Sequence, residues 1–219
     1  MSCAHCTAAG ELFDDRTARR DLKRYRKKGP SGTTRLLLDA LIERGVTGAS
    51  LLDIGGGVGA IQHELLAEGA TSAVNVDASP AYQAAARSEL ERHGTTERVL
   101  FVEGDVVERA DEIPEADIVT LDRVLCCYPD VDTLVDVSAG RARRMWGVVF
   151  PRERRFVRFG VAVINLVQRL RRDPFRVYVH STERVRGRAE ALGFRSALHV
   201  QSFLWQIRLF ERPGGGETG

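Results

Sequence analysis

Four aspartates and a cluster of glycines are the residues of this sequence best placed to do chemistry. Asp53 leads into Gly55-Gly56-Gly57-Val58-Gly59, and Asp77, Asp105 and Asp122 follow along the chain. Glycine tolerates positive φ and lets the backbone approach a ligand closely. A helix that starts after such a turn offers unpaired N–H groups and the positive end of its dipole. An apolar strand, this turn and an amphipathic helix, in that order, predict a site for a nucleotide-like ligand.

Two classes of cofactor are held by such a turn. Gly55, Gly57 and Ala60 match the G-x-G-x-x-G/A spacing of dinucleotide-binding folds. Asp53, Gly55, Gly57 and Gly59 also match D-x-G-x-G-x-G, and the stretch resembles that of class I S-adenosylmethionine-dependent methyltransferases. Asp53 favours the second interpretation, because a carboxylate suits the ammonium group of S-adenosylmethionine and would repel a pyrophosphate. The remaining alternative is a turn that only joins a strand to a helix.

Asp77 lies at the end of the predicted second strand. The resemblance implies that Asp77, beside Ala78 and Ser79, accepts hydrogen bonds from both ribose hydroxyls of the cofactor. Ser79 before Pro80 is also a good N-cap for the helix predicted over 81–93. The two roles are compatible, so we expect both.

Two further acids follow the third and fourth predicted strands. For Asp105 and Val106, the resemblance implies contacts of the carboxylate with the adenine amino group and of the backbone amide with a ring nitrogen. An ordinary turn residue is the alternative for Asp105. Asp122 and Arg123 follow the strand predicted over 116–121, and the resemblance implies that they border the reacting methyl group.

The loop from Leu121 to Pro129 has a narrower resemblance, to magnesium-protoporphyrin O-methyltransferases and related small-molecule O-methyltransferases. A histidine precedes Tyr-Pro in that loop, whereas Cys127 does so here, and no role of that histidine carries over. Tyr128 and His180 are the candidate catalytic residues, Tyr128 lining the acceptor site and His180 as general base. An ordinary loop or capping histidine is the alternative for His180. Cys126 and Cys127 are interpreted as inert buried thiols, since no neighbouring base is visible.

The elements that would position these residues alternate between strand and helix. The resemblance implies an α/β fold: a single Rossmann-like domain with a mostly parallel seven-stranded sheet, an antiparallel terminal strand and helices on both faces. Residues 1–45 are expected to form an N-terminal helical cap segment, 46–212 the cofactor-binding domain and 213–219 a disordered tail. The later elements are expected to be a helix over 132–144 that ends in arginines, a strand over 145–150, and a hairpin of 195–201 with 204–211.

The segment 156–170 is apolar on nearly every helical face and is flanked by arginines. The favoured interpretation is a buried helix packed on the sheet. The alternatives are a lid over a lipophilic acceptor, or a helix resting in a membrane surface as a peripheral contact. The segment is too short to span a bilayer.

Composition limits the class of protein. The chain has 219 residues, 43% of them hydrophobic, and a net charge of +2, so we expect no bulk affinity for nucleic acid. With no recognisable signal peptide, its four cysteines are expected to be reduced thiols of a cytoplasmic protein. Cys3-Ala4-His5-Cys6 would suit zinc, but a closed site needs more ligands, and we favour unligated thiols. No metal is therefore predicted at the site.

Together these features predict an enzyme that transfers a methyl group from S-adenosylmethionine to a small hydrophobic molecule, at oxygen. The absence of an N-P-P-Y-type tetrapeptide after the fifth strand disfavours amino acceptors. Two alternatives stay open: an NAD-dependent oxidoreductase and a non-catalytic protein of the S-adenosylmethionine-binding fold. The acceptor and the oligomeric state are not predicted.

Overall fold

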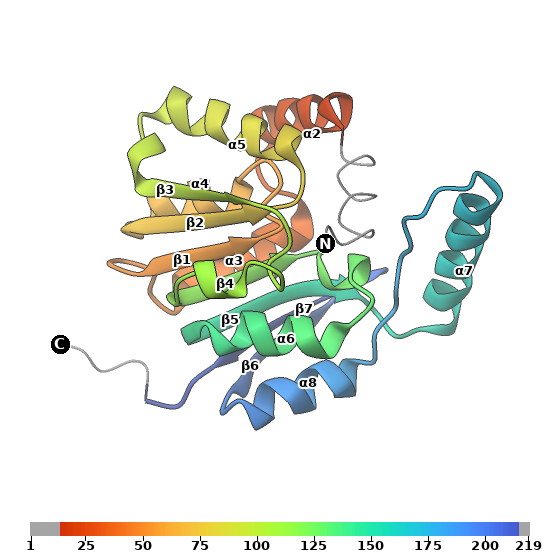
Figure 1. Ribbon diagram of the computed structural model, residues 1–219. Helices are drawn as coiled ribbons and strands as arrows, with labels where there is room; N and C mark the ends of the chain where they lie inside the picture. Colours follow the sequence, from red (N-terminus) through yellow and green to blue (C-terminus); the bar gives the residue numbers. More distant parts are fainter. Residues whose placement is uncertain (1–13, 215–219) are drawn as a thin grey trace.

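The computed structural model describes residues 14–214, which form one sheet with helices on both faces (Figure 1). The strands are β1 (Ser50–Ile54), β2 (Ser72–Asp77), β3 (Val99–Glu103), β4 (Ala116–Asp122), β5 (Ala142–Pro151), β6 (Arg195–Gln201) and β7 (Trp205–Glu211). The α-helices are α2 (Asp15–Lys28), α3 (Gly32–Glu43), α4 (Ala60–Ala67), α5 (Pro80–His93), α6 (Val131–Gly140), α7 (Arg155–Leu170) and α8 (Thr182–Ala191). Short 3-10 turns are η1 (Thr96–Arg98), η2 (Ala110–Glu112) and η3 (Leu125–Cys127).

The sheet has the order β3-β2-β1-β4-β5-β7-β6. Strands β1 to β5 pair in parallel, and β7 runs antiparallel to both β5 and β6. The mostly parallel sheet and the closing hairpin predicted from the sequence are thus confirmed. The chain winds outward from β1 to β3 and then returns to place β4 on the other side of β1. Such a switch point leaves a crevice at the carboxyl ends of the strands, where α/β proteins bind ligands.

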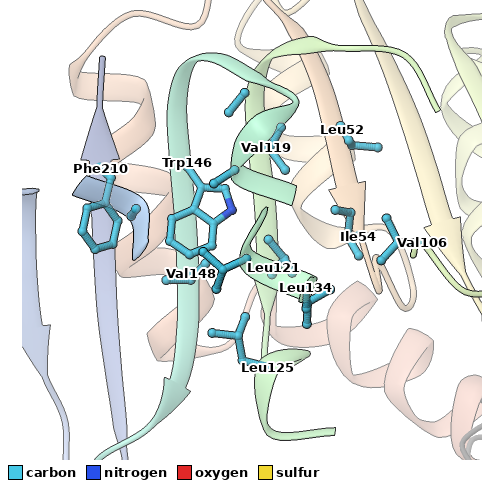
Figure 2. Packing of buried hydrophobic residues seen from close by; sticks show 14 of the residues in the cluster. Leu52, Ile54, Val106, Val119, Leu121, Leu125, Leu134, Trp146, Val148 and Phe210 are labelled. Carbon is cyan, nitrogen blue, oxygen red and sulfur yellow. The ribbon is translucent and has the colours of Figure 1, made fainter. Parts of the chain in front are cut away.

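Alternating side chains of the strands form two cores, one on each face of the sheet. Helices α6 and α8 cover the first core, in which Trp146 and Phe210 lie 5.4 Å apart between ring centroids (Figure 2). The Trp146 indole N–H also donates to the Ser138 hydroxyl at 3.1 Å, so its one polar group is satisfied. Helices α3 and α4 cover the second core, with Leu37 and Leu65 fully buried. Replacing a residue like Trp146 with alanine typically costs about 3–5 kcal/mol.

The boundary between α6 and β5 was predicted wrongly. Helix α6 ends at Gly140 and β5 begins at Ala142, so the arginines expected at the end of a helix belong to the turn and the strand. Arg141 donates to the carbonyl of Ile113 at 2.9 Å, and Arg143 pairs with Asp117 at 3.1 Å. These contacts with the segment 113–117 and the pairing of β5 with β4 stabilise a strand here. They outweigh the helical pattern of 141–144 in the sequence.

The prediction that 156–170 is a buried helix packed on the sheet is also wrong. The helix forms as α7, but only Val157 is buried, and Phe159 and Leu170 are 72% and 76% exposed. Helices α6 and α8 already occupy the face of the sheet beside β5, and α7 stands away from the body of the domain (Figure 1). In residues 14–214, no helix has the length and apolar character needed to cross a membrane.

Two other predictions fall partly or wholly on residues that the structure does not describe. Cys3, His5 and Cys6 lie outside the described residues, as does the tail after 214. Helices α2 and α3 make up the described part of the expected cap segment, and α2 packs on α5 through Ala18, Leu22 and Ala85. The division of the chain at 45 and 212 stays a prediction.

Candidate functional site

A cavity of about 370 Å³ lies at the switch point, where β1, β2 and β4 end. Its lining residues come from α2, the turn before α3, the glycine turn, the ends of β2, β3 and β4, and the start of α6. The structure brings most of the predicted site residues to this cavity: Asp53, Gly55, Gly56, Gly57, Asp77, Ala78, Ser79, Asp105, Val106, Asp122, Arg123 and Tyr128. Gly59 and His180 are not among the lining residues.

The glycine turn has a backbone that other residues would strain. Gly55 and Gly57 have φ of 63° and 56°, in the left-handed region. A Cβ atom on Gly55 would lie 2.4 Å from Cγ2 of Val124, so the turn packs against the segment after β4 without room for a side chain. Gly59 is the N-cap of α4 and has φ of 79°. No described side chain caps α4, and its first amides are therefore available to an anion.

Asp53 lies beneath this turn and is almost completely buried. Its Oδ1 accepts a hydrogen bond from the Thr120 hydroxyl at 2.7 Å, because β1 and β4 pair in a register that places the two residues opposite each other. Its Oδ2 has no hydrogen-bond partner among the described residues. Burial raises the pKa of Asp53 to about 7, with the carboxylates of Asp122 and Asp77 adding to the effect. This buried, incompletely satisfied acid suits a cationic ligand, whose charge would favour the ionised form.

Asp77 links the glycine turn to the segment that begins α5. Its Oδ2 accepts a hydrogen bond from the Gly57 amide at 2.9 Å, and its Oδ1 accepts one from the Ser79 amide at 2.8 Å. The Ser79 hydroxyl caps α5 by accepting from the Tyr82 amide, with Pro80 at the first helical position, so the predicted cap is confirmed. Burial raises the pKa of Asp77, and the two amides oppose that shift. The carboxylate is thus fixed at the cavity wall with lone pairs left for further donors.

Asp105 and Tyr128 meet across the cavity. The Tyr128 hydroxyl donates to Oδ2 of Asp105 at 3.1 Å, and Oδ1 accepts from the Val107 amide at 2.8 Å. Val106, which lies between Asp105 and Val107 in the sequence, is buried in the first core and also lines the cavity. Tyr128 therefore has a defined partner at the adenine-type subsite expected around Asp105. The contact joins the segment after β4 to the segment after β3, a relationship that the sequence did not predict.

Asp122 and Arg123 connect the end of β4 to the start of α3. The Thr34 hydroxyl donates to Oδ2 of Asp122, and Arg123 donates to the hydroxyls of Ser31 and Thr33. Arg123 has φ of 65°, an uncommon conformation for a residue with a side chain. Its Nε lies 3.4 Å from Oδ1 of Asp122. Burial raises the pKa of Asp122, against the opposing effect of the guanidinium. The N-terminus of α3 is thereby held against one wall of the cavity.

His180 lies behind the cavity wall. Its Nε2 is 2.9 Å from the carbonyl oxygens of both Leu125 and Tyr128, so Nε2 carries a proton and donates to them. The ring stacks on Tyr178, and burial lowers the pKa of His180. This geometry holds η3 and the backbone of Tyr128 in place. It does not bring an imidazole nitrogen into the cavity.

The adjacent cysteines differ in position. Cys126 is buried and donates to the carbonyl of Arg123 at 3.2 Å, while Cys127 lines the cavity. Contact with the Cys127 thiol and burial raise the pKa of Cys126 well above its ordinary value, as expected for an inert thiol. Within residues 14–214, no three side chains of the metal-binding types gather as a metal site would require.

Sequence analysis missed several residues of this cavity. Asp21, Arg24 and Tyr25 of α2 line it, and the Tyr82 hydroxyl donates to Asp21 at 2.8 Å. The signal was the spacing of Ala18, Leu22 and Tyr25, which places one face of the very charged helix against the body. Thr34 and Thr120 carried no such signal, because only the arrangement of α3 and the pairing of β1 with β4 reveals their partners.

The residues present fit S-adenosylmethionine, whose sulfonium and ammonium groups are cationic and whose carboxylate is anionic. The cavity lining carries five carboxylates and two guanidinium groups, an excess of negative charge. Oδ2 of Asp53 is a buried acceptor without a described donor, suited to an ammonium group. The uncapped start of α4 suits a carboxylate, and the backbone of the glycine turn leaves no space for a side chain at Gly55.

This fold, with such a cavity at its switch point, defines a class I S-adenosylmethionine-dependent methyltransferase. The chain belongs to the family of O-methyltransferase domains, whose model matches residues 10–137, more than half of its length. This result favours the methyltransferase over the dehydrogenase that the glycine spacing left open. None of the curated proteins compared with the chain matches it in sequence.

Solved structures show the same fold over nearly the whole chain. The magnesium protoporphyrin IX methyltransferase ChlM from Synechocystis PCC 6803, with bound S-adenosylhomocysteine, superimposes with a TM-score of 0.70 at 20% identity, covering 95% of this chain and 99% of ChlM. An O-methyltransferase family protein from Burkholderia thailandensis has a TM-score of 0.69 at 17% identity, covering 92% of this chain and 61% of that protein. The [4+2]-cyclase SpnF has a TM-score of 0.68 at 15% identity, covering 97% and 98%.

Proposed function

We propose that the protein transfers the methyl group of S-adenosylmethionine to an oxygen atom of a small hydrophobic molecule. The observation that carries the proposal is the match of residues 10–137 to the O-methyltransferase domain, the part of the chain that also lines the cavity. The similarity in fold to ChlM, described as a magnesium protoporphyrin IX methyltransferase, supports a small-molecule acceptor. Apolar side chains line part of the cavity, among them Ile54, Val58 and Leu134, and would suit a hydrophobic acceptor.

The cofactor supplies an electrophilic methyl group on a sulfonium ion. In this proposal Asp53 and the glycine turn hold the amino-acid end of the cofactor, and Asp77 accepts hydrogen bonds from the ribose. Asp105, positioned by Tyr128, and the amide of Val106 bind the adenine. These contacts fix the position of the cofactor, and alignment of an acceptor oxygen in line with the methyl group then supplies much of the rate.

Asp122 and Arg123 are proposed to border the reacting methyl group. Thr34 and Ser31 hold this pair, so the start of α3 positions the side of the cavity at which the acceptor would enter. Exclusion of water there strengthens the interaction of the carboxylates with the cationic cofactor. His180 is not proposed as a base, because its Nε2 proton is engaged by two carbonyl groups. Tyr128 is proposed as a residue of the cavity wall rather than as a proton acceptor.

The test is methyl transfer from isotopically labelled S-adenosylmethionine to paired acceptors that differ in one atom. A hydrophobic phenol is compared with the corresponding aniline, and an aromatic carboxylic acid with its amide. We expect labelled ether or ester and no labelled amine, with product confirmed by mass spectrometry. The control is Asp77→Asn, which should lose transfer, beside Asp111→Asn, an exposed acid that should not.

Two results would overturn parts of the proposal. Labelled aniline with unreacted phenol would contradict the oxygen acceptor and leave the methyltransferase. Tight binding of S-adenosylhomocysteine with no transfer to any hydroxyl or carboxyl acceptor would favour a different chemistry in the same fold, as the description of SpnF as a [4+2]-cyclase illustrates.

A further inference from the structure

Helix α7 exposes an apolar stripe along its full length. Six large side chains recur every three or four residues, which places them on one side of a helix, and all of them are exposed: Phe156, Phe159, Val163, Leu166, Val167 and Leu170. Leu170 is 76% exposed and Phe159 72%. The helix stands away from the rest of the domain (Figure 1). Contiguous apolar surface of this kind on a globular protein usually marks a binding site.

The turn between β6 and β7 extends this stripe. Phe203 is 76% exposed and stacks on Phe156, with 5.2 Å between the ring centroids. Leu204 beside it is also exposed, and its carbonyl accepts from the Arg152 amide at 2.9 Å, which ties the turn to the segment before α7. Two parts of the chain far apart in sequence thus form one apolar area. We call the apolar stripe of α7 together with Phe203 and Leu204 the α7 surface.

Positive charges predominate around the α7 surface, with one acid, Glu153 or Asp173, just beyond each end of the arginine-bearing segment. Residues 154–172 contain six arginines and no aspartate or glutamate. Three of them precede or enter the helix and three end or follow it: Arg154, Arg155, Arg158, Arg169, Arg171 and Arg172. All six are exposed, and only Arg158 has an acidic partner, Glu153 at 2.7 Å, among the described residues. The α7 surface is therefore an apolar strip with a group of arginines at each end.

The other side of α7 is already occupied by its own return segment. The Asn165 side chain donates to the carbonyl of Val177 at 2.8 Å and accepts from the Val177 amide at 2.9 Å. Val157 is the buried residue of the helix. No residue of 152–180 lines the cavity, so α7 does not form a lid over it in this structure. The apolar stripe is left facing solvent.

We propose that the α7 surface binds peripherally to an anionic lipid bilayer. The apolar stripe would enter the boundary between headgroups and acyl chains, and the arginines would contact phosphate and carboxylate groups of the lipids. A second copy of the chain fits less well, because an isologous contact through α7 would bring the two sets of arginines against each other. Binding of the α7 surface to lipid does not depend on the identity of the methyl acceptor.

The test is co-sedimentation of the full chain with vesicles of phosphatidylcholine alone and of phosphatidylcholine with phosphatidylglycerol. We expect binding to the anionic vesicles that weakens at high salt, since salt shortens the range of the charge interaction from about 10 Å at 0.1 M to about 3 Å at 1 M. Arg169→Gln with Arg171→Gln and Arg172→Gln should weaken binding about a hundredfold, since each arginine near an anionic surface contributes about a factor of five.

A second variant removes the apolar contacts: Phe159→Ser with Leu166→Ser and Leu170→Ser. These side chains are exposed, so the variant should keep its fold and its affinity for S-adenosylhomocysteine while losing the vesicles. The matched controls are Leu100→Ser, an exposed leucine on β3, and Lys27→Gln with Lys28→Gln, exposed cations at the end of α2. Both controls should bind vesicles as the natural chain does.

Several results would overturn the proposal. These are no binding to either kind of vesicle, equal binding to neutral and anionic vesicles, or unchanged binding of the serine variant. A further one is a dimer in lipid-free buffer that the serine variant converts to a monomer, without vesicle binding by the natural chain. That last result would assign the α7 surface to a second copy of the protein.

Discussion

The hydroxyl of Thr120 donates a hydrogen bond to Oδ1 of Asp53 at 2.7 Å across the paired strands β1 and β4. This bond satisfies half of a carboxylate that is 1% exposed, and Oδ2 has no donor among residues 14–214. Burial therefore favours the protonated form of Asp53. A cation beside Oδ2 would favour the ionised form.

The first prediction concerns the dependence of stability on pH. Burial raises the pKa of Asp53 from 3.8 to about 7, so between pH 4 and 7 the folded protein holds a proton that the unfolded chain has released. The free energy of unfolding should therefore fall as pH rises through this window, by up to a few kcal/mol at about 1.4 kcal/mol per pH unit. Burial also raises the pKa of Asp77 and Asp122, which act in the same direction.

Asp53→Asn isolates the contribution of Asp53. Because asparagine does not titrate, the stability of the natural protein relative to this variant should decline from pH 4 to 7 and then level off. Urea unfolding of the ligand-free proteins at a series of pH values measures it. A difference that is constant over that range would show that Asp53 does not titrate there.

The second prediction separates the backbone conformation of the glycine turn from its function. Gly57 and Gly94 have φ of 56° and 67°, and a Cβ atom on either would meet no close neighbour. Gly57→Ala and Gly94→Ala should each cost about 1–2 kcal/mol of stability through the left-handed backbone. Only Gly57→Ala should weaken binding of S-adenosylhomocysteine, because Gly57 lines the cavity while Gly94 ends α5. Calorimetric titration and thermal unfolding measure the two effects, and equal binding by both variants would contradict the role of the turn.

The third prediction tests Asp77. In Asp77→Asn one carboxylate oxygen becomes an NH₂ group, which cannot accept a hydrogen bond from the Gly57 or Ser79 amide. We expect S-adenosylhomocysteine to bind at least about tenfold more weakly, consistent with the loss of a charge-assisted bond and a disturbed turn. Asp111→Asn is the matched control, since Asp111 is exposed and lies outside the cavity. Equal titration curves for the two variants would refute the ribose contact.

The fourth prediction distinguishes support from catalysis at His180. His180→Gln keeps a side-chain donor for the carbonyls of Leu125 and Tyr128, whereas His180→Ala removes it. The alanine variant should be destabilised by about 1–3 kcal/mol and the glutamine variant by less. If His180 is structural, the glutamine variant retains methyl transfer with an unchanged pH profile. Loss of turnover in a stable glutamine variant would instead restore His180 as a general base.

The strand ends and the cavity acids were predictable because their signals are local. Strand, glycine turn and helix follow one another within a few residues of the sequence. The carboxyl ends of parallel strands lie at one edge of the sheet, so polar residues that end such strands lie near one another. The N-cap at Ser79 was predictable for the same reason, since Pro80 is its neighbour. The expected mostly parallel sheet with its antiparallel terminal strand came with the resemblance carried by these motifs.

Contacts between distant segments were not predictable. Thr120 faces Asp53 only because of the register of β1 with β4, and Thr34 reaches Asp122 only because α3 begins beside β4. The apolar sequence of 156–170 predicted a helix but could not show on which side of it other parts of the protein would lie. The prediction that this helix is buried on the sheet was wrong, because α6 and α8 already cover the neighbouring face of the sheet.

The segment that contains α7 begins and ends at nearly one point, between the end of β5 and the start of α8. Oε2 of Glu153, just after β5, accepts a hydrogen bond from the amide of Thr182, the first residue of α8, at 3.2 Å. A segment whose two ends meet can change in length or composition without moving the strands beside it. Every residue that lines the cavity lies between Asp21 and Leu134, well before this excursion. The segment that contains α7 could therefore differ between related proteins while the cavity stays the same. Proteins with one binding site for the cofactor would then bind to different surfaces in the cell.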